Sequence, residues 1–181
     1  LVVVHGYRTQ FESALRMTAF VGHVLDINAP ILVFDWPANQ GDSLRGYRRA
    51  RQVAEASGED LARALELIIR DIRPERLWLL ANSMGAQVVV DAFGLLHQRG
   101  DFADAETEIE EVVFTAPDVD HEKLNRQFKQ EIKDLARRLT VYVSSNDRAL
   151  LISRLINRRK RGGESTLSPD MLEEAVRVAD L

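Results

Sequence analysis

Runs of apolar residues alternate with helix-like patterns along the whole chain, and each run has the length of a strand. They fall at residues 1–4, 31–34, 76–80, 112–114 and 139–143, and Arg76 and Thr140 are the polar residues among them. Apolar runs without polar alternation are typical of parallel strands that are buried on both faces. Strand and helix alternating five times with short crossovers predicts an α/β fold, a doubly wound and mostly parallel sheet with helices on both faces.

Between the strands, apolar residues recur every three or four positions, as in helices with one buried face. One such set predicts a helix near residues 10–26: Phe11, Ala14, Leu15, Thr18, Gly22 and Leu25. A second set predicts a helix that must end before Pro74: Leu61, Ala64, Leu65, Ile68 and Ile72. Further helices are expected at residues 84–97, 122–137 and 149–156.

Polar segments separate these elements without suggesting a second domain. Residues 37–46 are rich in Pro, Gly, Asp and Ser and predict a long loop, and the acidic stretch 101–111 is expected to be a solvated connection. We therefore expect a single domain over residues 1–181. Its core spans 1–156, and residues 157–181 form a basic loop and a C-terminal amphipathic helix.

The third strand leads into Ala81-Asn82-Ser83-Met84-Gly85 and then directly into a helix. A serine on such a tight turn has strained backbone geometry, so the residues two before and two after it must be small, as Ala81 and Gly85 are. The Met84 N–H then lies at the helix N-terminus, where unpaired donors favour an oxyanion. This is the form of the nucleophile elbow of α/β-hydrolases, with Ala81 replacing the usual glycine. An ordinary strand-to-helix turn with a chance serine is the alternative.

Other candidate groups follow the strand ends, which right-handed crossovers gather at one edge of the sheet. We expect the Tyr7 N–H to be a second oxyanion donor beside that of Met84, with Gly6 allowing the sharp turn. His5 is expected to bond nearby backbone. Trp36 is either a wall of an acyl pocket or a core residue.

A serine nucleophile requires an acid and a base. Asp147 follows the second strand after the nucleophile strand, the common position of the acid, and Asp118 follows the intervening strand, an alternative that some lipases use. Either aspartate could instead bond its own turn. None of the four histidines follows Asp147. Three possibilities for the base remain. His121 is a minor candidate, and the favoured one is a histidine beyond Leu181. The third possibility is a site that has no base.

Composition changes this picture little. The 181 residues are 45% hydrophobic and 29% charged, with a net charge of −4 that gives no reason to expect a nucleic acid partner. Without cysteine there is no disulfide or Cys-based metal site, which fits a cytoplasmic protein. No apolar run approaches the ~20 residues of a membrane-spanning helix. The basic run 158–161 is either solvated surface or a contact for an acidic partner or lipid headgroups.

The chain opens at Leu1 inside a strand, which suggests an excerpt of a longer protein, truncated at both ends of its fold. A signal peptide or lipid anchor would then lie upstream.

Five motifs resemble, in order and spacing, those of a bacterial family of α/β-hydrolases of unknown function, over Leu1 to about Ile156. They are V-V-V-H-G-Y, F-D-W-P, A-N-S-M-G, A-P-D-V-D and V-Y-V-S-S-N-D-R-A-L. The resemblance implies a serine-hydrolase core with Ser83 as nucleophile and Asp147 as acid. Members of the family usually have His in the place of Asn82 and carry a further histidine downstream.

The sequence thus predicts an esterase- or lipase-like serine hydrolase that acts on carboxylic esters through an acyl-enzyme on Ser83, with no metal or cofactor. Two alternatives use the same residues. One is a non-catalytic scaffold of this fold that binds a small ligand or a protein, and the other is an acyltransferase or amidase.

Overall fold

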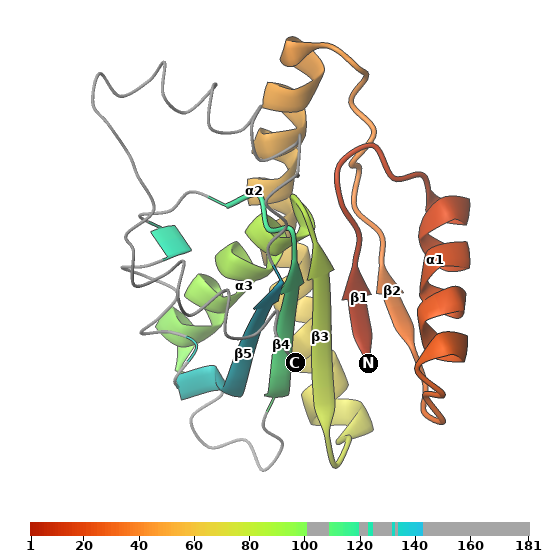
Figure 1. Ribbon diagram of the computed structural model, residues 1–181. Coiled ribbons are helices and arrows are strands. Elements are labelled where there is room, and N and C mark those ends of the chain that lie inside the picture. The colour runs from red at the N-terminus through yellow and green to blue at the C-terminus, as the bar shows by residue number, and fades with distance from the viewer. Residues whose placement is uncertain (101–108, 120–122, 125–131, 133, 143–181) are drawn as a thin grey trace, which may run out of the picture.

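Parallel strands form one sheet in the order β2-β1-β3-β4-β5 (Figure 1). The computed structural model describes residues 1–100, 109–119, 123–124, 132 and 134–142. Its strands are β1 (Val2–Val4), β2 (Leu32–Phe34), β3 (Leu77–Asn82), β4 (Ile109–Thr115) and β5 (Ala136–Tyr142). Its helices are α1 (Phe11–Val24), α2 (Leu44–Leu67), the π-helical turn η1 (Ile68–Ile72) and α3 (Gly85–Arg99). The predicted α/β architecture is confirmed.

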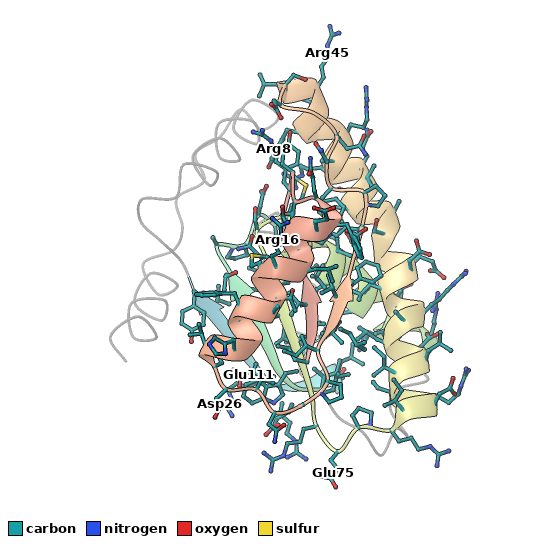
Figure 2. The ribbon with its side chains drawn as sticks, turned by 90° about the vertical axis from the view of Figure 1, so that its right-hand side faces the viewer. Arg8, Arg16, Asp26, Arg45, Glu75 and Glu111 are labelled. Atoms are coloured by element: carbon teal, nitrogen blue, oxygen red, sulfur yellow. The ribbon has the colours of Figure 1, made fainter. Side chains whose placement is uncertain are left out.

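The chain changes direction within the sheet at β1. It runs outward from β1 to β2, then crosses back over β1 to β3 and continues to β4 and β5. Because crossovers between parallel strands are right-handed, the first crossover puts α1 on one face and the later ones put α2 and α3 on the other (Figures 1 and 2). The loops after β1 and β3 therefore leave neighbouring strands toward opposite faces. Ligand sites of open α/β sheets lie at such a switch point.

Burial of the strands follows their position in the sheet. All three residues of β1 are buried, as the sequence predicts. The expectation of a second buried strand is wrong for β2, in which Leu32 is exposed and Val33 and Phe34 are half-buried. The reason is that β2 pairs only with β1 in the described sheet and forms its edge. A periodic apolar pattern does not distinguish an edge strand from a central one.

The first helix is confirmed, but its predicted buried face is not. Ala14 and Thr18 are buried, whereas Phe11, Leu15 and Leu25 are exposed. The strand that α1 mainly contacts is the short edge strand β2, which covers only part of the apolar stripe of the helix. None of the described helices is both long and apolar enough to cross a bilayer.

Helix α2 begins inside the segment that the sequence assigned to a loop. Ser43 caps it, because its Oγ accepts a hydrogen bond from the Gly46 N–H at 3.1 Å. Leu61 and Leu65 are buried as predicted, and the helical stretch ends at Ile72, before the proline. Ile72 itself is exposed, so its predicted core position is wrong.

Two predicted boundaries are also wrong at β4 and β5. The stretch assigned to a solvated connection contributes Ile109 and Glu111 to β4, and Glu111 is buried and accepts a hydrogen bond from the Thr140 hydroxyl at 2.5 Å. Strand β5 begins at Ala136, where the sequence predicted the end of a helix. Pairing between β4 and β5 gives the Glu111 carboxylate its hydrogen-bond donor. A single sequence does not show which strands pair.

Helices α2 and α3 approach closely at Gly58. A Cβ at this position would lie 2.6 Å from the Asp91 Cβ and 3.1 Å from the Ala92 N of α3. Farther along, the Arg99 guanidinium of α3 bonds Glu59 at 2.7 Å and Glu66 at 2.8 Å, both on α2. The hydrogen bond from Arg99 lowers the pKa of Glu59 below its usual range. This helix pair supports the face of the sheet behind β3.

We expect Gly58→Ala to destabilise the fold by about 1–3 kcal/mol, because the added methyl group overpacks the helix contact. In an exposed helix the same change stabilises by roughly 1 kcal/mol. Urea unfolding measures the difference. The control is Ala56→Gly at an exposed position of the same helix, which should cost only the helix propensity. A Gly58→Ala protein as stable as the parent would contradict the close approach.

Candidate active site

Ser83 occupies the turn between β3 and α3, with a φ of 51° in the left-handed region. Residues that carry a side chain avoid this conformation, at a cost of roughly 1–2 kcal/mol. Two backbone hydrogen bonds hold the turn. The Ser83 N–H donates to the Thr115 carbonyl at 2.9 Å, and the Ser83 carbonyl accepts from the Ala86 N–H at 3.1 Å. The backbone strain that the sequence predicted is present at the serine.

Gly85 brings this turn against the backbone of β1. A Cβ at residue 85 would lie 2.6 Å from the Val4 carbonyl oxygen and 2.5 Å from that of His5. Neither oxygen can yield, because both belong to backbone at the centre of the sheet. On the other side, Ala81 is fully buried between β1 and β4. The small residue that the sequence predicts at position 85 is therefore required for steric reasons.

The loop after β1 lies against the serine as well. A Cβ at Gly6 would lie 3.1 Å from the Ser83 Cβ and 2.8 Å from the Asn82 Oδ1. The next residue in the chain is Tyr7, and the next after the serine is Met84. Within the described residues we find no hydrogen-bond partner for the N–H of either. These two N–H groups therefore belong to the two segments that meet beside Ser83, at the switch point of the sheet.

His5 is held by its own partners. Its side chain is fully buried, with Nε2 2.9 Å from Asp35 Oδ1 and Nδ1 3.2 Å from the Gly6 carbonyl. The Trp36 indole N–H donates to the His5 carbonyl at 2.8 Å, and the two rings stack at 5.8 Å. The expected backbone contact of His5 is present. Trp36 is a core residue, 2% exposed.

A second polar group connects α2 to the loop after β4. Asp118 is only 4% exposed; its Oδ2 accepts a hydrogen bond from the Tyr47 hydroxyl at 2.5 Å, and its N–H donates to the Ser83 carbonyl at 3.0 Å. The Tyr47 ring meets Tyr7 edge-to-face at 5.5 Å. Burial raises the pKa of the Tyr7 phenol, which therefore stays protonated and donates to the Gly41 carbonyl.

The sequence did not pair Tyr47 with Asp118 or His5 with Asp35. A partial signal existed for the tyrosine, because Tyr47, Ala50 and Ala54 follow helical spacing and all three are buried. No periodicity indicates which groups meet across 71 residues of chain.

Asn82 and two further histidines are placed as follows. Asn82 donates to the Thr115 Oγ1 at 2.9 Å, which joins β3 to β4 beside the elbow. His23 lies in the last turn of α1. His97 lies in the last turn of α3, 3.4 Å from Asp134. Both lie at helix ends remote from the carboxyl edge of the sheet.

Several predicted residues lie outside the described part of the chain. They are Asp147, His121 and the basic run 158–161. Within the described residues, no group of three or more His, Asp or Glu side chains is placed to hold a metal ion. What the described site offers is a serine on a turn with positive φ, and two N–H groups in the adjoining segments without a partner among the described residues.

Comparison with known proteins identifies one family. The model described as "Alpha/beta hydrolase of unknown function (DUF900)" matches residues 1–178. No curated protein and no solved structure matches the chain.

We expect Ser83→Gly to be more stable than Ser83→Ala by about 1 kcal/mol, because both lose the hydroxyl and only glycine relieves the positive φ. Thermal or urea unfolding of the two variants measures the difference. Equal stabilities would mean that the backbone at residue 83 is not strained.

Proposed function

Since the chain belongs to a family of α/β-hydrolases of unknown function, we propose that it is a serine hydrolase of carboxylic esters with Ser83 as its nucleophile. The observation that carries this proposal is the strained serine at the switch point between β1 and β3. Arg8, Asp26, Arg73 and Ala116 also have a positive φ. What distinguishes Ser83 is that its turn joins β3 to the N-terminus of α3 at the switch point.

The proposed chemistry is acyl transfer. The Ser83 Oγ attacks the ester carbonyl carbon while a base takes the hydroxyl proton, and the carbonyl oxygen becomes an oxyanion. The N–H groups of Tyr7 and Met84 stabilise that charge. The intermediate collapses to an acyl-enzyme as the alcohol leaves with the proton, and water then releases the acid by the same steps in reverse.

The base is proposed to be a histidine outside the described residues, oriented by Asp147, with Asp118 as the alternative acid. In the structure Asp118 already accepts a hydrogen bond from Tyr47 and holds the Ser83 carbonyl through its N–H. These contacts support a role for Asp118 in fixing the elbow, which leaves the acid to Asp147.

Fluorophosphonate labelling of protein expressed from its complete reading frame tests the nucleophile. An activated serine should react, and peptide mass spectrometry should find the label on Ser83 alone. Ser83→Ala should remain unlabelled. Unlabelled protein from the same preparation then enters a screen of esters, amides and acyl acceptors, which separates the esterase from the amidase and the acyltransferase. A folded protein that takes no label would overturn the hydrolase proposal in favour of a binding scaffold.

Asparagine substitutions separate the two aspartates. We expect Asp147→Asn to slow labelling about 10³- to 10⁴-fold, because the base loses its orienting carboxylate. Asp118→Asn should lower the free energy of unfolding more than it lowers the labelling rate, since the Tyr47 hydroxyl loses a charged acceptor. The matched control is Tyr47→Phe, which removes the same hydrogen bond and leaves the Asp118 carboxylate in place. The reverse ranking of labelling rates would make Asp118 the acid.

A further inference from the structure

The first turns of α2 carry a concentrated positive charge. Residues 43–54 hold four arginines and no acidic residue, in a chain whose net charge is −4. Arg45, Arg48 and Arg49 are exposed, and none of them forms an ion pair within the part of the chain that the structure describes. We refer to these three residues together with Leu44 as the arginine tip.

The arginine tip stands beside the candidate active site. The first turns of α2 rise beyond the carboxyl ends of the strands (Figure 1), and Arg45 projects from their far end (Figure 2). On the inner side of the same turns, Tyr47 is buried and bonds Asp118, whose N–H holds the Ser83 carbonyl. The charge therefore lies on the same edge of the molecule as Ser83.

A large apolar side chain is exposed at the first residue of each of the helices α2 and α1. Leu44 is 58% exposed at the first residue of α2, and Phe11 is 54% exposed at the first residue of α1. The loops that precede the two helices are joined, because Arg8 pairs with Asp42 at 2.9 Å and the Tyr7 hydroxyl donates to the Gly41 carbonyl. Exposed apolar residues among arginines are typical of surfaces that lie in a lipid interface.

The position of the arginines is not explained by the stability of the fold. Cations at a helix N-terminus are disfavoured by the helix dipole, and α2 has no acidic residue in its first turn. The acid just before it, Asp42, is already paired with Arg8. An anionic surface outside the molecule would offset this repulsion.

We propose that the arginine tip docks on a membrane surface rich in anionic phospholipids and so turns the carboxyl edge of the sheet, with Ser83, toward the lipid. An acidic protein partner would complement the arginines but leave Leu44 and Phe11 without a role. The membrane accounts for both, since headgroups pair with the guanidinium groups and the apolar side chains enter the interface.

Cosedimentation with vesicles tests the proposal. Ser83→Ala protein is used, so that the result does not depend on the proposed chemistry. It should bind vesicles of phosphatidylcholine mixed with phosphatidylserine, bind phosphatidylcholine alone much more weakly, and lose affinity at high salt. Equal binding to both vesicles, or none to either, would overturn the proposal.

Matched variants locate the surface. The double change Arg48→Gln with Arg49→Gln should weaken binding about 30-fold, at roughly fivefold for each charge. The control is Arg63→Gln with Arg70→Gln, which removes the same charge from exposed positions lower on α2 and η1. If another part of the chain makes the membrane contact, the two double variants should bind vesicles equally well. That outcome would overturn the assignment to the arginine tip.

A second pair tests the apolar contribution without changing the charge. Leu44→Gln should weaken vesicle binding severalfold, whereas Leu67→Gln, 49% exposed near the opposite end of α2, should not. If Leu44→Gln did not change vesicle binding, the partner would be recognised by charge alone, and the membrane proposal would be overturned. Circular dichroism of each variant confirms that α2 is intact.

Discussion

The close approach of Gly85 to β1 is the contact on which the candidate site depends. Only a residue without a Cβ lets the first turn of α3 lie against the carbonyl oxygens of Val4 and His5. That contact seats the elbow over the centre of the sheet, where β1 and β3 diverge. It also fixes Ser83 at its positive φ and brings the loop of Gly6 beside it. The strain at the serine is sustained because buried backbone surrounds it.

Polar side chains around the serine hold backbone in place. Asp35 and Trp36 fix His5 and with it the loop that leads to Tyr7. Asp118 joins Tyr47 of α2 to the Ser83 carbonyl. These contacts hold the two segments that carry the proposed oxyanion donors, and donors fixed in advance are what stabilisation of an oxyanion requires. They also connect the first turns of α2, with their exposed arginines, to the edge of the sheet that carries Ser83.

The sequence-based predictions that the structure contradicts share one cause. Leu32, Phe11 and Ile72 belong to apolar patterns of the right period, yet each is exposed because no described element covers that side of it. Glu111 shows the opposite error, since a charged residue in an acidic stretch is buried once β5 supplies Thr140. Periodicity reports which side chains share a face. It does not report what lies opposite.

Local sequence by itself determined the parallel α/β architecture, the Ala81-to-Gly85 turn and the strained serine, because these follow from the spacing of apolar residues and from the small residues flanking Ser83. Family membership over residues 1–178 agrees with that reading. Only the tertiary structure decided that Asp118 pairs with Tyr47 and His5 with Asp35. Those partners are distant in the chain, and only the packing of helices on the sheet brings them within hydrogen-bond distance.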